Sequence, residues 1–341
     1  MIWLTWRQHR KQVLFAVIGL AALAAALLPT GLQMHDKFNN SGLAACLAKL
    51  GTAQMVSAKA SNSCQDLSGN FSHEFGGMSL IAILLLVLPL LVGLFFGAPL
   101  VAREVEHGTH RFVWTQGVSR LRWGTVKFSL VGGITLVLAA AYGLGAGWWS
   151  APLTESGNGR LMPLVFDFQG IAPIGYTVFA VALGIFVGTV WRKVLPAMGV
   201  TVVGFIAVRI LVETLLRPRF LSAQSLSFSF TGDDVPNPSS GDWVYSSGIR
   251  NAAGQMVAPG AQVECNGGGI SISGPVNAAN PQSVGAGSCG SQAGFGPGDY
   301  NWEQYQPGSK FWDFQGLETG IFMALAVLLV FFAIRRLGRL S

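Results

Sequence analysis

Six long apolar stretches restrict what this chain of 341 residues can fold into. They occupy residues 12–33, 78–102, 127–149, 168–191, 194–215 and 317–334. Each holds about 18–25 residues, enough for a helix that rises about 1.5 Å per residue to cross a hydrocarbon layer of about 30 Å. Only 11% of all residues are charged, whereas soluble domains carry about 25%. The chain is therefore predicted to be an integral membrane protein.

Helices rather than strands are expected to cross the membrane. Near-continuous apolarity suits a helix, which satisfies its backbone hydrogen bonds internally in lipid, whereas a β-barrel would show alternation over about ten residues. The predicted fold is all-α and polytopic, with six transmembrane helices. The first stretch is too long for the apolar core of a signal peptide and has no clear cleavage site before Pro29, so it is predicted to be retained.

Basic residues predict the orientation of these helices. With a cytoplasmic N-terminus, 13 of the 22 Lys and Arg residues lie on short cytoplasmic segments, beside only two acidic residues. The other nine basic residues share the rest of the chain with 14 acidic residues. The positive-inside rule then places both termini in the cytoplasm, in a multi-pass protein of the plasma membrane. The net charge of +6 arises from these basic residues near the ends of the helices. No nucleic-acid partner is expected, because no basic face exists away from the membrane.

The four cysteines agree with this orientation. Cys46 and Cys64 lie in the first external loop, and Cys265 and Cys289 lie in the last. Disulfides persist in oxidising compartments, so we expect the pairs Cys46–Cys64 and Cys265–Cys289, with free thiols as the alternative. Each would close a short loop, worth roughly 3 kcal/mol on the chain-entropy model.

Composition divides the chain into four parts. Residues 1–11 are expected to form a cytoplasmic amphipathic helix in the membrane interface, or else an ordinary helix end. Residues 12–215 hold the first five transmembrane helices and a loop at 103–126, and residues 317–341 hold the last helix and a tail. Between them, residues 216–316 are rich in Gly, Ser, Asn and Pro. The runs 261–265 and 269–273 resemble strands, so a small, irregular, disulfide-stapled external domain with β character is predicted.

Glycine pairs four residues apart recur in the apolar stretches. They are Gly93 with Gly97, Gly143 with Gly147, and Gly184 with Gly188. Such pairs allow close approach of helices, either within one chain or at a dimer seam. Two prolines, Pro89 and Pro99, predict a kink in the second helix.

The segment from Ala102 to Lys127 is the charged loop between the second and third helices. Gly108 is expected to end the second helix in a left-handed conformation. Thr109 would cap a short transverse helix that exposes Phe112 and Trp114, and Ser119 would cap the next helix. This arrangement is suited to docking a cytoplasmic partner.

A family resemblance rests on this loop and on both ends of the chain. Glu104, Glu106, Gly108 and Thr109 form a Glu-x-Glu-x-Gly-Thr motif, which Val118-Ser119-Arg120 and Lys127 follow. With the N-terminal IWLTWRQHRKQ and the run Tyr305 to Phe322, these residues resemble the permeases of ABC-2 type exporters, in particular their actinobacterial branch. The external loop 216–316 departs from the family pattern.

The resemblance implies partners and site residues. Such permeases dimerise and bind two soluble ATPase subunits, on which a coupling helix in the loop docks, supported by the N-terminal helix. The residues that the resemblance places at or near this contact are Glu104, Glu106, Gly108, Thr109, Arg111, Phe112, Trp114 and Arg120.

The sequence contains no Gly-Lys dipeptide and therefore no phosphate-binding loop of a P-loop ATPase. The chain is expected to be no enzyme and to bind no cofactor, with ATP and Mg²⁺ held by the separate ATPase. A metal site at His107 and His110 is not expected, because these residues lack a well-spaced ligand set.

Arg209 and Glu213 are the only charges well inside an apolar stretch. Their spacing allows an ion pair on one helix face, which would either line a transport pathway or act structurally near the outer interface.

Two functions compete. The leading hypothesis is the permease subunit of an ATP-driven exporter for an amphiphilic or hydrophobic small molecule or lipid, acting as a homodimer. The alternative is a non-transporting membrane sensor or scaffold whose external domain binds a ligand or a protein. Co-purification of a stoichiometric ATPase would separate them.

Overall fold

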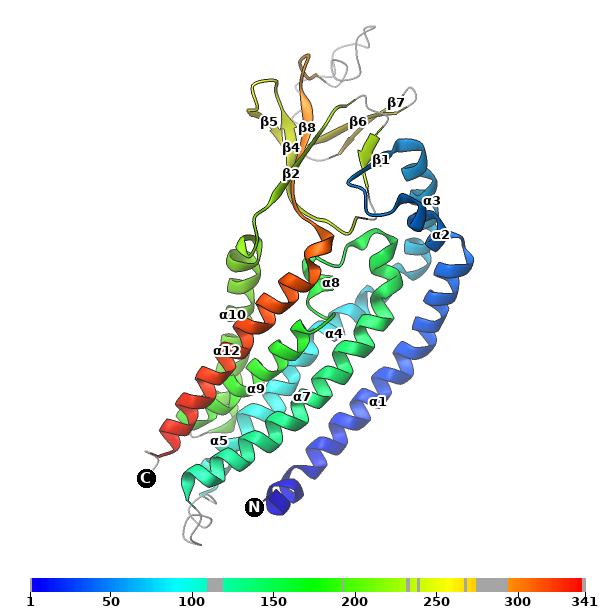
Figure 1. Ribbon diagram of the computed structural model, residues 1–341. Helices are drawn as coiled ribbons and strands as arrows, with labels where there is room; N and C mark the ends of the chain where they lie inside the picture. Colours follow the sequence, from blue (N-terminus) through cyan, green and yellow to red (C-terminus); the bar gives the residue numbers. More distant parts are fainter. Residues whose placement is uncertain are drawn as a thin grey trace.

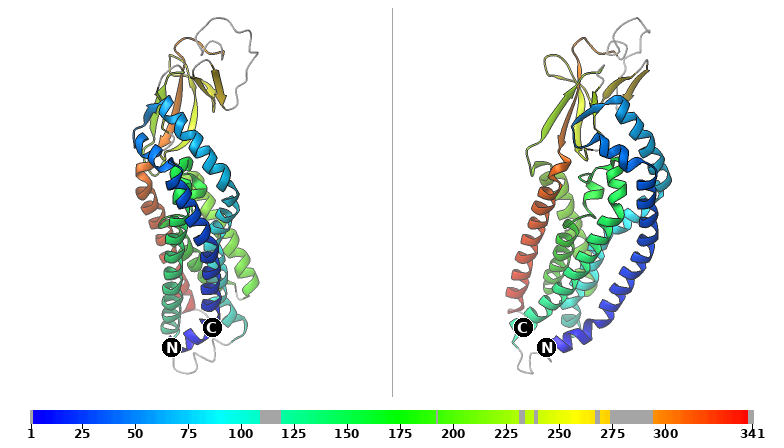
Figure 2. Two further views of the ribbon diagram at one scale, coloured as in Figure 1. Left: turned by 90° about the vertical axis from the view of Figure 1, so that its right-hand side faces the viewer. Right: turned by 45° about the vertical axis from the view of Figure 1, so that its right-hand side comes forward.

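The computed structural model describes residues 2–108, 119–191, 193–230, 234–237, 240–266, 269–273 and 294–338. Long helices form an elongated bundle that carries a β-rich cap at one end, the cap end (Figure 1). Both termini lie at the opposite end, the termini end (Figures 1 and 2). In the described part, six segments are long and apolar enough to cross a membrane, which agrees with the number and order predicted: Arg10–Asn40, Ile81–Glu106, Arg120–Gly157, Ala172–Val190, Val194–Arg219 and Gly308–Leu337.

Several spans consist of an α-helix joined to π-helical or 3-10 turns. The helices of the spans are α1 (Ile2–Asn40), α4 (Ser79–Val92), α5 (Ala98–Glu106), α7 (Arg120–Leu153), α9 (Ala172–Val190), α10 (Val194–Leu211) and α12 (Phe311–Leu337). Alpha4 and α5 are separated by a π-helical turn, Gly93–Gly97, between the two prolines that predicted a kink. A π-helical turn, Val212–Leu216, and a 3-10 turn, Arg217–Arg219, extend α10.

The N-terminal residues do not form a separate helix. Residues 2–11 belong to α1 and run without a break into the first span. No Gly or Pro interrupts this part of the sequence, so the backbone has no local reason to end the helix. Trp3 and Trp6 are both exposed on its first turns.

The most buried span is α9, at the centre of the bundle. Its Gly184 faces the start of α5 so closely that a Cβ atom would lie 2.5 Å from the Ala98 nitrogen. From the other side, a Cβ on Gly93 would lie 2.4 Å from the Cβ of Ala180. These glycine pairs therefore serve packing within one chain, where the backbones of the second and fourth spans touch.

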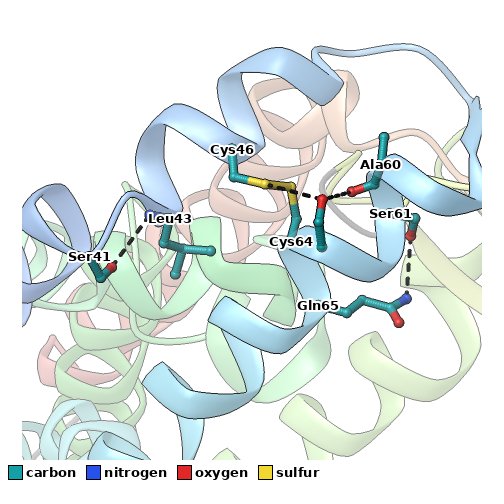
Figure 3. Close-up of a disulfide and its surroundings, with 8 residues drawn as sticks. Ser41, Leu43, Cys46, Ala60, Ser61, Cys64 and Gln65 are labelled. Atoms are coloured by element: carbon teal, nitrogen blue, oxygen red, sulfur yellow. Dashed lines mark hydrogen bonds between the residues drawn. A yellow bond between two sulfur atoms is a disulfide. The ribbon is translucent and has the colours of Figure 1, made fainter.

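The first loop of the cap is helical. Alpha2 (Leu43–Leu50) and α3 (Ala58–Phe75) flank the short strand β1 (Met55–Ser57). The predicted disulfide Cys46–Cys64 is confirmed and joins the two helices, with the Cα atoms 5.7 Å apart (Figure 3). The second predicted pair cannot be followed, because Cys289 and the side chain of Cys265 lie outside the described residues.

The last loop contains more ordered structure than its composition predicted. An antiparallel sheet has the order β2 (Gln224–Phe228), β8 (Tyr300–Gln306), β4 (Trp243–Arg250) and β5 (Met256–Pro259). The two runs predicted as strands form the antiparallel pair β6 (Gln262–Asn266) and β7 (Gly269–Ser273). A further strand, β3 (Asp234–Pro236), pairs with β1, so the two loops form one cap.

The sheet stands on two membrane helices. Strand β2 follows the turns that end α10, and β8 leads through Gly308–Lys310 into α12. Because β2 and β8 are hydrogen-bonded neighbours, any change in the spacing of α10 and α12 at the cap end must be accommodated by the sheet (Figure 1).

Candidate coupling surface and a buried ion cluster

The predicted coupling segment begins and ends as the sequence indicated. Alpha5 ends at Glu106, and Gly108 follows with φ of 69°, a left-handed conformation that glycine adopts without strain. Ser119 is the N-cap of α7, and its hydroxyl accepts a hydrogen bond from the Arg122 amide at 3.3 Å. Thr109, Arg111, Phe112 and Trp114 lie outside the described residues.

Glu104 points into the bundle and forms an ion pair with Lys127 of α7. Both side chains are largely buried, with 15% of Glu104 and 4% of Lys127 exposed. The reason is local: Glu104 follows the buried Leu100 by one helical turn, and residues four apart share a helix face. The ammonium group of Lys127 also lies 4.9 Å from the ring centre of Trp123. Glu104 therefore joins α5 to α7.

Glu106 joins α5 to α10. Its Oε2 accepts a hydrogen bond from the amide of Val194, the first residue of α10, at 2.9 Å. A carboxylate at this position accepts a hydrogen bond from an amide that has no partner within the helix. Its negative charge is also stabilised by the positive end of the helix dipole. Arg120 makes a third contact at the termini end, where its Nη1 donates to the carbonyl of Gly338 at 3.3 Å.

A buried cluster of four charged side chains lies at the cap end of the bundle. Arg217 donates from Nε to Glu318 Oε2 at 2.8 Å, and from Nη2 to Asp167 Oδ1 at 2.5 Å. Arg209 binds the same two carboxylates. Its Nη1 lies 3.1 Å from Glu318 Oε1, and its Nη2 forms an ion pair with Asp167. Arg217 and Glu318 are fully buried, and 4% of Asp167 is exposed. Two positive and two negative groups thus neutralise one another at a site with little exposure to solvent.

Tyr176 of α9 completes this cluster. Its hydroxyl donates to Glu318 Oε1 at 2.6 Å, and its ring lies under the Arg209 guanidinium, 3.8 Å from the ring centre. Together, the ion cluster of Asp167, Tyr176, Arg209, Arg217 and Glu318 connects α9, α10 and α12 with the residue that follows α8 (Pro163–Phe166). Buried charges persist in proteins when they are paired and hydrogen-bonded in this way.

The pairing of Arg209 with Glu213 that the sequence allowed is not formed. Arg209 instead binds Asp167 and Glu318. The i, i+4 argument assumed a regular α-helix, but the backbone changes to a π-helical turn at Val212, and this alters the angular position of the residues beyond it. The sequence did not predict Asp167 and Glu318 as partners of Arg209, because each lies at the end of an apolar stretch, where a charged residue is common.

Gln315 carries a signal that could have revealed this region. It lies three residues before Glu318, so both side chains share one face of α12. Its Oε1 accepts hydrogen bonds from the amides of Ile171 and Ala172, at 3.0 and 2.7 Å, where α9 begins. Its Nε2 donates to the carbonyl of Phe166 at 3.2 Å. Gln315 and Glu318, three residues apart in the last helix, therefore make the polar contacts that connect α12 to α9.

The bundle also contains apolar cavities. One of about 200 Å³ lies between α1, α4, α7 and α9, lined by residues that include Leu23, Leu88 and Tyr142. A groove of about 600 Å³ at the cap end runs between the end of α3, α4, α7 and α8. Over the described ranges, no group of three His, Cys, Asp or Glu side chains is placed to hold a metal ion. The hollows can accept apolar groups, and the polar residues are arranged to connect helices.

A family model described as ABC-2 membrane transporter related matches residues 17–217. The match covers more than half of the chain. It includes all or most of each of the first five spans, the coupling segment, and Asp167, Arg209 and Arg217 of the ion cluster. No curated protein and no solved structure matches the chain.

Proposed function

This chain belongs to the ABC-2 membrane transporter related family, and we propose that it is the permease subunit of an ATP-driven exporter. The family places it as a multi-pass membrane component of an ABC transporter. The proposal adds that two copies bind two soluble ATPase subunits at a cytoplasmic termini end. It also adds that the carried molecule is an amphiphilic or hydrophobic small molecule or lipid, and that it moves outward.

The observation that carries this proposal is that α10 is held at both ends. At the termini end, Glu106 binds the first amide of α10, immediately before the coupling segment. At the cap end, Arg209 and Arg217 bind Asp167 and Glu318. A displacement of the coupling segment by an ATPase would therefore act on α10 through Glu106, and the ion cluster would pass it to α12.

The contact of α5 with α9 supports the same mechanism. The two helices approach at Gly97 and Gly184 with no side chain between them, because a Cβ on either glycine would lie 2.5 Å from the other backbone. A contact between backbones cannot yield by a change of rotamer. A push on α5 would therefore move α9 as a body, as in the shear or hinge motions of packed helices.

The cavities support the proposed class of substrate. The cavity between α1, α4, α7 and α9 is lined almost wholly by apolar side chains. Among its lining residues, Tyr142 and Thr177 carry a hydroxyl group. Between membrane-spanning helices, an apolar surface of this kind binds apolar molecules through close packing. The basic residues near the termini end support the proposal that this end lies in the cytoplasm.

The experiment is a transport assay with the ATPase bound. The permease and its ATPase are reconstituted in proteoliposomes, and ATP hydrolysis and the movement of a fluorescent amphiphile are measured together. Replacement of both Glu104 and Glu106 by Ala removes the contacts to α7 and α10, so we expect less transport for each ATP hydrolysed. Glu74→Gln, an exposed change at the cap end, is the control. An unchanged ratio of transport to hydrolysis in the double variant would contradict the proposed route.

The alternative, a sensor or scaffold without transport, is favoured by one observation. The cap is an ordered structure in which strands from both loops pair, and long ordered loops often bind ligands. A chain that purifies from its native membrane without any ATPase would support this alternative over the exporter.

A further inference from the structure

A separate cavity lies within the cap, away from the apolar cavities of the bundle. Its volume is about 270 Å³. One wall belongs to the sheet and includes Asp242, Trp243, Glu303 and Tyr305. The opposite wall belongs to the first loop and to the connection after α7, with Gln54 and Met162. The cavity thus lies between the sheet carried by α10 and α12 and the part of the cap carried by α1, α4 and α7.

Strand register explains why a carboxylate and an aromatic ring meet on the sheet wall. Glu303 and Tyr305 are two residues apart on the central strand β8, so their side chains share one face. On the same face, Leu226 of β2 lies opposite Glu303, and Val244 of β4 lies opposite Tyr305. Glu303 is 8% exposed and Tyr305 is 4% exposed. The acidic group is therefore held beside an aromatic ring and aliphatic side chains, with little contact with water.

The charged residues among the described lining of this cavity are acidic. Of the described residues that line it, Asp242 and Glu303 carry a charge, and none is Lys, Arg or His. Asp242 accepts a hydrogen bond from the Gly308 amide at 2.8 Å, and Glu303 accepts one from the Gln262 amide group. These donors hold the two carboxylates in position. Burial raises the pKa of the Tyr305 hydroxyl, and the negative charges of Asp242 and Glu303 raise this pKa further.

We propose that this cavity binds a small organic cation, an ammonium group attached to an apolar or aromatic body. Carboxylates together with aromatic rings such as those of Trp243 and Tyr305 are the groups that recognise alkylammonium ions, by charge and by cation–π attraction. Leu226 and Met162 offer apolar surface to the rest of the molecule. Aliphatic and aromatic walls supply few oxygen ligands, so a bare Ca²⁺ or Mg²⁺ ion fits the cavity less well.

Occupation of the cavity would link the two parts of the cap. A molecule in contact with Glu303 on β8 and with Met162 after α7 touches elements that stand on different spans. Binding to the folded chain alone raises its stability by mass action. The bound cation is therefore expected to raise the Tm and to hold the α10–α12 pair in its present position relative to α7.

The test measures binding to the full chain in nanodiscs of zwitterionic lipid, without ATP or an ATPase, so that it does not depend on transport. The probe is benzyltrimethylammonium, followed by calorimetric titration and by the Tm. Its uncharged counterpart is neopentylbenzene, which has the same shape, and CaCl₂ tests for a simple metal site. We expect saturable binding of the probe with a rise in Tm, and neither effect with the other two compounds.

Variants locate the site. Asp242→Asn, Glu303→Gln and Trp243→Phe should each weaken binding of the probe, the two carboxylate changes by about tenfold. Glu74→Gln removes the same charge from an exposed ion pair at the cap end and should leave binding unchanged. Because Gln262 also depends on Glu303, Asp242→Asn decides the outcome if Glu303→Gln fails to fold. Absence of binding, equal binding of neopentylbenzene, displacement of the probe by CaCl₂, or wild-type affinity in Asp242→Asn would overturn the proposal.

Discussion

Removal of one charge from the ion cluster should destabilise the protein far more than removal of a similar charge nearby. Glu318 is fully buried and accepts hydrogen bonds from Arg217, Arg209 and Tyr176, at 2.6 to 3.1 Å. Glu318→Gln keeps the size of the side chain and removes its charge. The two guanidinium groups then face the single carboxylate of Asp167, and an uncompensated positive charge is left in a buried position.

The expected magnitude follows from this count of charges. Removal of one partner from a buried ion pair costs about 3–5 kcal/mol, because the other partner stays desolvated. At about 2–4 °C for each kcal/mol, Glu318→Gln should lower the Tm by roughly 6–20 °C. The lower half of this range is the better expectation, because the shift for a given energy decreases as chain length grows.

The assay is thermal unfolding of the purified chain in nanodiscs, with Asp313→Asn as the matched control. Asp313 lies on the same helix and pairs with Lys310 at 3.5 Å, but both side chains are about half exposed, 55% and 50%. Such an exposed pair is worth less than about 1 kcal/mol. A second variant, Glu318→Gln with Arg209→Gln, restores the balance of charge and should recover part of the loss. Equal shifts for Glu318→Gln and Asp313→Asn would refute the reasoning.

Three further predictions concern other parts of the chain. Gly184→Val should sharply reduce the yield of folded protein, because its Cβ would lie 2.5 Å from the α5 backbone, whereas Gly145→Val, with no atom within 4 Å, should be tolerated; size-exclusion chromatography of both variants checks this. Loss of the Cys46–Cys64 disulfide by a double Ser replacement should cost roughly 3 kcal/mol, to be measured as a lower Tm than that of the native chain without reducing agent. The raised pKa of Tyr305 means that the folded chain holds this proton more tightly than the unfolded chain. The resulting contribution to the stability of the folded chain is complete below a pH of about 10 and is lost as the pH rises above that value. Above a pH of about 10, the Tm of the native chain should therefore fall more steeply than the Tm of Tyr305→Phe. Parallel Tm curves against pH would contradict this.

Local signals in the sequence predicted the parts of the fold that depend on local physics. The spans follow from runs of apolar residues, which need no knowledge of their neighbours. Gly108 and Ser119 were identified from backbone preference and capping, which act over a few residues, and the Cys46–Cys64 pair follows from closeness in the chain. All three were found where the sequence placed them.

Contacts between distant residues could not be predicted from local patterns. The Glu104–Lys127 pair joins the two helices that flank the coupling segment, and no spacing in the sequence specifies it. The assignment of Glu104 to a contact with an ATPase stays a prediction. The Glu318–Arg217 pair spans 101 residues, and no pattern in either helix specifies it. The sheet poses the same difficulty, because β2 and β8 are hydrogen-bonded across the whole loop.

The central claim is that this chain acts with a separate ATPase at its termini end. It is tested most directly by the mass of the complex purified from the native membrane through a tag on this chain. The account predicts a particle of two permease chains and two soluble ATPase subunits, in which a photo-crosslinker placed at Trp114 of the coupling segment attaches to the ATPase. A permease that purifies without any ATPase, or a crosslinker that never reaches one, would contradict it.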